Sequence, residues 1–219
     1  MKKLICGLTL IFCLVSLFGC SPKPDPKEPV NQFFEAAKTL DYDKMKELVA
    51  PENSDEIQPK FTGEMANYES CFADYLKESA AKLEFTIEEE VEEKDDNATV
   101  KVHCKYVDGA QILKETMSEY LVEALDCALK GEKLSEEKTA EMIASMITEK
   151  QEAKEETMLE KTIEVSCVKI ENKWYLSDVN DELKNLIYSN CLTASDEISE
   201  SLQQVPEESS GSTSSATLL

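Results

Sequence analysis

The sequence contains no arginine and a single histidine, His103. All 23 basic residues are lysines, and against 45 Asp and Glu residues they leave a formal net charge of -22. Without guanidinium groups, the chain lacks the bidentate donor that suits phosphate and carboxylate recognition. A surface this acidic also repels the phosphate backbone. The composition therefore excludes nucleic acid as a partner.

The motifs of common enzymes and metal sites are missing as well. There is no Gly-rich phosphate loop, no GxSxG, no HExxH and no Ser/His/Asp arrangement. No CxxC pair occurs, and a single histidine supplies few of the ligands that a zinc site needs. His103 itself falls on the polar face of a predicted strand, where a solvated side chain is expected. We predict no catalytic residues, no metal site and no cofactor.

Carboxylates are dense between residues 88 and 96, which read EEEVEEKDD. One interpretation is a Ca²⁺ site, but such sites need backbone carbonyls and a tight turn, as in the EF-hand loop with its central Gly. This stretch has no Gly, and its carboxylates alternate between the two faces of a strand. We therefore predict a solvated strand end rather than a cation site.

An odd number of cysteines follows Cys20. Five follow Cys20, namely Cys71, Cys104, Cys127, Cys167 and Cys191. An odd number outside the cell leaves at least one free thiol, and their spacing lacks the close pairing of a disulfide framework. Two interpretations stay open: most of them are small buried apolar residues, or one pair forms a disulfide.

The chain begins with Met-Lys-Lys and continues with an apolar run over residues 4–18. Roughly 15 apolar residues are too few for the ~20 that span a bilayer as a helix, but they match the core of a signal peptide. The run ends in Leu17-Phe18-Gly19-Cys20, and a proline-rich stretch follows. A buried helix or an uncleaved anchor would explain the apolar run but not the Gly-Cys junction or the prolines.

This junction resembles the lipobox of bacterial lipoproteins, in which the chain is cleaved before a cysteine that carries a diacylglyceryl group. The resemblance implies a lipid on Cys20 and a location on the extracytoplasmic face of the cell membrane. Two acyl chains anchor a protein stably, whereas one chain binds only marginally. We therefore expect the membrane itself to be a partner, through this lipid.

Composition divides the chain into four segments. Residues 1–19 form the predicted signal peptide, and residues 20–28 hold the lipidated cysteine and a spacer whose prolines favour extended backbone. Residues 29–192 have the length of one ordinary domain. Residues 193–219 are acidic and rich in Ser and Thr, so we predict a disordered tail.

Apolar residues recur at helical spacing in some segments of the domain and alternate in others. Helices are predicted at residues 30–37, after Asp41, at 62–82, at 109–130, from Ser135 onward and at 181–188. Strands are predicted at residues 83–87, 100–106, 162–170 and 174–179. The predicted fold class is α+β, with N-terminal helices packed on a curved antiparallel sheet of about four strands. A two-helix insertion lies between the two predicted hairpins.

This order resembles the nuclear-transport-factor-two-like superfamily, as do the opening Pro29-Val30-Asn31-Gln32-Phe33-Phe34 and the closing Asn172-Lys173-Trp174-Tyr175-Leu176. More narrowly, it resembles small lipoproteins of Gram-positive bacteria that carry such a domain. The likeness covers residues 29–190 and implies a cone-shaped domain. Enzymes of that fold use a pocket carboxylate, His or Tyr pair, and this sequence shows no matching set. The candidate pocket lining is Tyr68, Tyr106 and Trp174, which serve equally well as core residues.

Three functions stay open at this point. The leading hypothesis is a non-enzymatic domain at the cell envelope that binds an envelope protein or a small apolar ligand. The alternative is a small enzyme using an apolar cone pocket, which requires a carboxylate or Tyr beside Trp174. The third is an envelope protein that buffers cations through its bulk charge.

Overall fold

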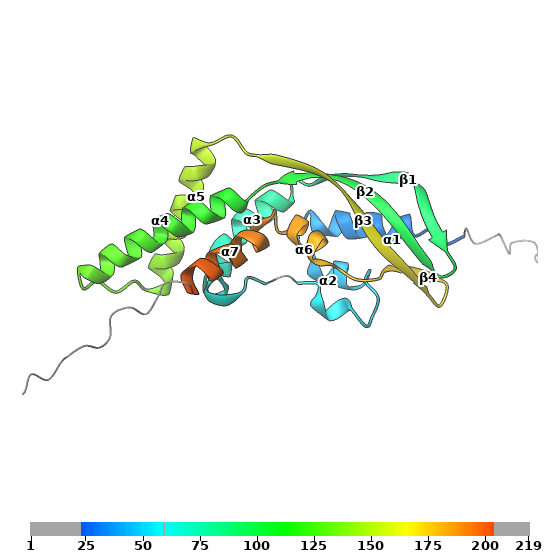
Figure 1. Cartoon of the computed structure of the whole chain (residues 1–219), viewed down its shortest axis with the longest axis horizontal. Helices are drawn as coiled ribbons and strands as arrows, with labels where there is room; N and C mark the ends of the chain where they lie inside the picture. Colours follow the sequence, from blue (N-terminus) through cyan, green and yellow to red (C-terminus); the bar gives the residue numbers. More distant parts are fainter. Residues whose placement is uncertain (1–22, 59, 204–219) are drawn as a thin grey trace, which may run out of the picture.

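The computed structural model describes residues 23–58 and 60–203, so the predicted signal peptide, Cys20 and residues 204–219 lie outside the described part. The described chain forms an elongated α+β molecule (Figure 1). Its elements are α1 (Lys27–Ala37), α2 (Tyr42–Lys46), η1 (Ser54–Glu56), η2 (Gly63–Phe72), α3 (Ala73–Ala80), β1 (Glu84–Lys94), β2 (Asn97–Val107), α4 (Ala110–Leu129), α5 (Glu136–Ala153), β3 (Met158–Ile170), β4 (Lys173–Leu176), α6 (Asp181–Ile187) and α7 (Cys191–Gln203). The predicted fold class is confirmed.

The four strands form one antiparallel sheet in the order β1-β2-β3-β4. Two hairpins build it, and β2 pairs with β3 between them over the whole length of β2. Val100, Val102 and Cys104 of β2 are fully buried, while His103 between them is exposed. This alternation is the period of a strand with one wet face, and it sets which face of the sheet carries the core.

Helix α1 packs under the sheet and contacts both edge strands, β1 and β4 (Figure 1). Its buried face carries Val30, Phe33 and Phe34, at the spacing of one helical stripe. The ring of Phe34 lies 5.1 Å from that of Phe85 on β1. The helix begins at Lys27, so Pro29 stands in its first turn, where the missing N–H costs nothing.

The single helix predicted at residues 62–82 is wrong in part, because the structure divides it into η2 and α3. Ten residues, Gly63–Phe72, form a 3-10 helix, and Gly63 at its start has a φ of +56°. Asn67 and Ser70 within it favour turns over helix interiors. Met65 and Phe72 are fully buried nonetheless, so apolar spacing predicted the buried face but not the helix type.

The predicted two-helix insertion forms α4 and α5, between β2 and β3. Gly131 ends the first helix with a φ of +75°, and the Ser135 hydroxyl accepts a hydrogen bond from the Lys138 N–H at 3.2 Å to start the second. The two helices pack together and form an arm at the end of the molecule away from the strand turns (Figure 1).

The predicted tail boundary at residue 193 falls inside α7, and this is a correction to the sequence-based limits of the domain. Ala194, Ser195 and Ser199 are buried where α7 packs against α4 and η2. The Ser199 hydroxyl donates to the Thr62 carbonyl oxygen at 2.9 Å. Small and hydroxylated residues line this contact, so the segment looks polar in sequence.

No helix of the described residues has the length and apolar character needed to cross a bilayer.

Candidate functional site

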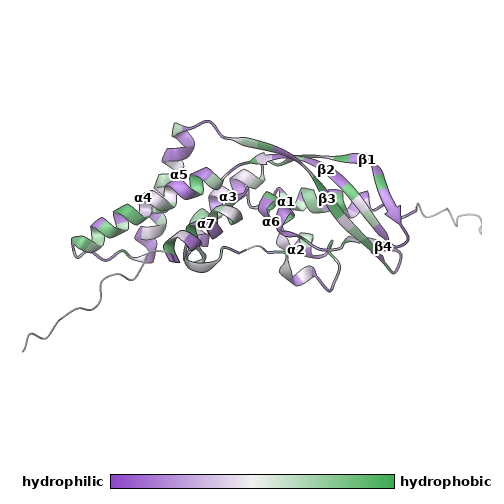
Figure 2. Cartoon of the chain, viewed as in Figure 1, coloured by the Kyte–Doolittle hydropathy of each residue, from purple (hydrophilic) through white to green (hydrophobic). Residues whose placement is uncertain are grey.

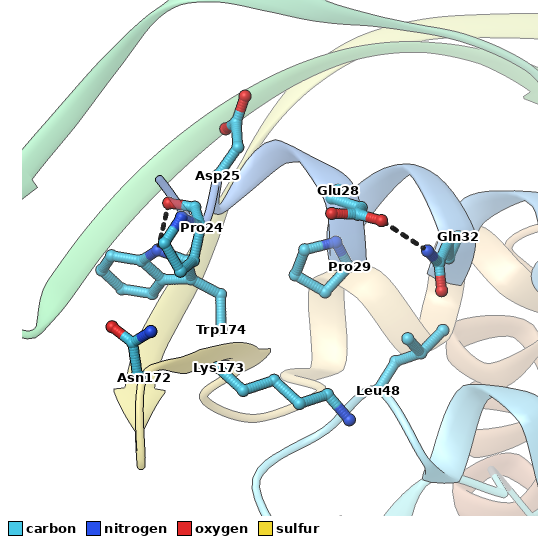
Figure 3. Close-up of a pocket in the computed structure, with 9 residues that line it drawn as sticks. All are labelled: Pro24, Asp25, Glu28, Pro29, Gln32, Leu48, Asn172, Lys173 and Trp174. Atoms are coloured by element: carbon cyan, nitrogen blue, oxygen red, sulfur yellow. Dashed lines mark hydrogen bonds between the residues drawn. The ribbon is translucent and has the colours of Figure 1, made fainter. Parts of the chain in front are cut away.

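A shallow hollow of about 200 Å³ opens beside Trp174 and is the candidate ligand site (Figure 3). The β3–β4 turn positions this tryptophan, because Glu171 and Asn172 take φ values of 48° and 66°. Two consecutive residues with positive φ form the tight hairpin turn that matches strand twist. The turn places Trp174 on the core face of β4, and its side chain is buried.

The N-terminal segment of residues 23–27, here called the strap, covers one side of Trp174. The indole Nε1 donates a hydrogen bond to the Pro24 carbonyl oxygen at 3.1 Å. Pro26, two residues on, is buried. The strap therefore belongs to the folded domain where it passes β4.

Two ion pairs tie the strap to β1 at the other edge of the sheet. Lys23 Nζ lies 3.0 Å from a Glu93 carboxylate oxygen, and Lys27 Nζ lies 3.4 Å from one of Glu89. These acidic residues come from the carboxylate-rich stretch, which forms the exposed second half of β1. Part of that acidic run thus fastens the strap. The sequence contains one signal for these two ion pairs: the two lysines are four residues apart, and so are the two glutamates.

The lining of the hollow is mixed in chemistry. Asp25 and Glu28 supply carboxylates, Lys173 an amine, and Gln32 and Asn172 amides, beside the apolar surface of the remaining residues. Gln32 Nε2 donates to Glu28 Oε1 at 3.4 Å. Drug-sized ligands occupy pockets of roughly 300–1,000 Å³ that are mostly apolar. The hollow therefore suits a small polar group rather than an extended apolar substrate.

The three aromatic residues predicted to line one pocket lie apart. Tyr68 on η2 packs its ring 5.3 Å from that of Tyr120 on α4. Tyr106 pairs with Leu159 in the sheet, whereas Trp174 pairs with Lys169. Leu159 and Lys169 are ten residues apart on β3, which is about 33 Å along a strand. Of these three aromatic residues, Trp174 alone is among those that line the hollow of Figure 3.

The five cysteines of the described residues are free, which fits the first of the two interpretations that the sequence left open. Burial raises the pKa of Cys104 and of Cys167 to about 12, and it raises the pKa of Cys191 as well. The thiolate is the reactive form of cysteine, so these three thiols are poorly suited to act as nucleophiles or metal ligands near neutral pH. Cys71 is half-buried, and Cys127 is buried.

The remaining candidates for chemistry are dispersed. His103 is exposed, and its Nδ1 lies 3.3 Å from Thr162 Oγ1 on the neighbouring strand. Within residues 23–58 and 60–203, no group of three or more His, Cys, Asp or Glu side chains is placed to hold a metal ion.

A scan against protein-family models and searches of curated proteins and solved structures found no match to this chain. The family resemblance stays a prediction. The function has to be inferred from the residues themselves.

Proposed function

We propose that the chain is a lipid-anchored domain on the extracytoplasmic face of the cell membrane that binds a partner and does not catalyse a reaction. The observation that carries this proposal is the strap. Only residues 21 and 22 separate Cys20 from Lys23, the first residue of the strap. Three Cα steps reach at most about 11 Å, so a lipid on Cys20 would hold this end of the domain against the bilayer.

The tether would also orient the molecule. The strap is attached at the end of the sheet where the β1–β2 and β3–β4 turns lie, and the α4–α5 arm lies at the opposite end (Figure 1). A lipid at the strap would therefore direct the arm away from the membrane. This arrangement suits a domain that presents a surface to other envelope components.

The alternative of a small enzyme gains no support from the hollow. Asp25 and Glu28 are the carboxylates beside Trp174, and both are exposed. General acid–base catalysis relies on carboxylates whose pKa is shifted by burial or by a charged neighbour in a dry site. Solvated carboxylates around a small hollow favour binding over turnover.

The anchor is tested by comparing the wild-type chain with Cys20→Ala in bacterial cells. We expect the wild type in the membrane fraction, with a diacylglyceryl mass on the peptide that begins at Cys20. The variant should lose both that mass and its retention in the membrane. A variant that stays in the membrane fraction as firmly as the wild type would refute the anchor.

Binding is tested by native mass spectrometry on residues 21–219, which retain every described residue. A stoichiometric added mass that disappears in a Trp174→Ala, Lys173→Ala variant would assign a small ligand to the hollow. A clean apo mass would direct the search to protein partners. A turnover rate abolished by one substitution would contradict the non-enzymatic proposal.

A further inference from the structure

One face of α4 carries three large apolar side chains that are exposed to solvent. Val122 is 70%, Leu125 62% and Leu129 80% exposed, and they are the exposed large hydrophobic residues of the described chain. Their spacing of three and four residues puts them on one side of the helix. We call them the α4 stripe, and Figure 2 shows the hydrophobic colour along the outer half of this helix.

The stripe continues a contact that α7 makes with the first half of α4. Met117 and Leu121 of α4 face Ile198 and Leu202 of α7 across a groove of about 310 Å³. The described part of α7 ends at Gln203, while α4 runs on to Leu129. Leu125 and Leu129 follow Leu121 at successive intervals of four residues, so they extend the row that α7 packs against.

The row of α4 side chains beyond Leu121 is long enough to contact a second helix. Eight residues of α-helix separate Leu121 from Leu129, which is about 12 Å or slightly more than two turns. A second helix laid in line with α7 would meet the same row of α4 side chains. Helices that carry anchors at a spacing of three and four residues bind apolar grooves in this way.

The charge around the stripe selects the partner. Residues 118–153, which make up most of the α4–α5 arm, contain nine carboxylates and four lysines. Lys130 pairs with Asp126, and Lys150 pairs with Glu119, so lysines beside the stripe are already engaged. Glu123 on the same helix has no ion pair among the described residues. A basic partner would complement this surface, whereas a second copy of this acidic chain or an anionic membrane would be repelled.

We propose that the α4 stripe binds a basic amphipathic helix of another protein, seated alongside α4 in line with α7. The inference rests on the proposed function, because it names the surface and the partner class of the binding domain. The stripe lies on the arm, away from the strap (Figure 1), so a lipid at Cys20 would leave it accessible to an envelope protein.

The test uses residues 21–219 and synthetic helical peptides of about five turns. The first peptide has leucines at a spacing of three and four residues with lysines on both flanks. The second has glutamates in place of the lysines, and the third has serines in place of the leucines. We expect the first peptide to bind at least about tenfold more tightly than either of the others, because apolar burial and charge both contribute.

The matched variants are Leu125→Ser, Leu129→Ser in one chain and Ala144→Ser, at an exposed position of α5, in another. The double variant should bind the first peptide at least about tenfold more weakly than the wild type, and the α5 variant should bind it unchanged. Circular dichroism and the melting temperature confirm that both variants remain folded. Because the stripe side chains are exposed, their replacement should leave stability nearly unaltered.

Four results would overturn the inference. Equal peptide affinity of the wild type and the double variant would mean that bulk charge alone attracts the peptide. A wild-type dimer that the double variant dissociates in sedimentation would assign the stripe to a second copy. Leucine-dependent binding to vesicles of neutral phospholipid would assign it to a membrane. A ligand mass in the hollow together with no peptide binding would leave the proposed function in place and remove only this inference.

Discussion

The indole Nε1 of Trp174 donates a hydrogen bond to the carbonyl oxygen of Pro24, which lies 150 positions earlier in the chain. The bond joins the last strand of the sheet to the segment that precedes the first helix. The strap is thereby part of the folded structure, and the single tryptophan of the sequence reports on its position.

Removing the strap should expose Trp174. A chain that begins at Lys27 lacks Pro24–Pro26, the residues that cover the indole. Because water would then reach the ring, we expect its tryptophan emission to shift to longer wavelength. Lys23→Ser removes one exposed ion pair, which is worth between zero and about 1 kcal/mol, and should leave the emission unchanged. Identical spectra for the truncated and complete chains would show that the strap does not cover Trp174 in solution.

Trp174→Phe should destabilise the domain while retaining an aromatic ring in the core. The substitution removes the N–H donor and leaves the Pro24 carbonyl without this partner, so we expect a loss of about 1–3 kcal/mol in the free energy of unfolding. Urea titration followed by circular dichroism measures it. Tyr175→Phe, on the half-buried neighbouring position of β4, serves as the control and should change stability far less.

Gly109→Ala should destabilise the junction between β2 and α4. An added Cβ would lie 2.8 Å from Cys191 Sγ, 2.8 Å from the Tyr75 hydroxyl and 3.1 Å from the Ser189 carbonyl oxygen. The Gly109 N–H donates to that same carbonyl at 2.7 Å, which limits relaxation of the backbone. Overpacking of this kind costs about 1–3 kcal/mol.

A second substitution tests whether crowding of the added methyl group against Cys191 causes the loss of stability. Cys191→Ala in the Gly109→Ala background removes the closest sulfur, so the two losses of stability should not add. Thermal melts of the two single variants and the double variant measure the coupling. Strict additivity would refute the contact as the source of the destabilisation.

Stability should fall as the pH rises from about 9 to about 12. Burial raises the pKa of Cys104 and Cys167 from 9.0 to about 12, so the folded state retains their protons while the unfolded chain loses them. The stabilisation is complete below pH 9 and declines through this window. The pKa values of half-buried Tyr42 and of buried Tyr75 and Tyr188 are also raised, and they act in the same direction at the upper end.

Urea titrations at successive pH values measure this decline. A Cys104→Ala, Cys167→Ala variant should begin less stable, because two buried side chains are smaller, but its stability should fall less steeply between pH 9 and 10. An equally steep fall in the variant would assign the effect to other groups.

Thiol labelling of the native protein should modify Cys71 first. Its side chain is half-buried, whereas those of the other four cysteines in residues 23–58 and 60–203 are buried. Burial also raises the pKa of Cys71, so we expect its reaction with a disulfide reagent at pH 8 to be slower than that of a free thiol. Cys71→Ser should abolish this first phase of labelling. Two or more thiols labelled rapidly without denaturant would contradict the described burial.

The sequence predicted the elements whose buried face is made of large side chains. Val100, Val102 and Cys104 alternate cleanly with polar residues, and β2 forms over that segment. Asp95-Asp96-Asn97 has the composition of a turn, and Asp95, with a φ of 56°, lies between β1 and β2. Ser135 and Asp41 were recognisable as helix starts, and both side chains accept backbone hydrogen bonds.

The parts that sequence reasoning missed depend on contacts distant in the chain. Helix α7 is stabilised where small residues, such as Ala194 and Ser195, pack closely on α4 and η2, and small residues give no strong periodic signal. The prolines before α1 predicted an extended spacer. Their contact with Trp174 requires knowing that the first and last elements of the sheet are neighbours.

The strap has a mechanical consequence. Its Lys23 ion pair reaches β1, its hydrogen bond reaches β4, and these are the two edges of the sheet. A force applied at the N-terminus, such as the drag on a domain held by its lipid, would therefore be divided between both edges before it reached the first turn of α1. Single-molecule pulling from the N-terminus should accordingly show a first rupture event that is absent in a chain beginning at Lys27.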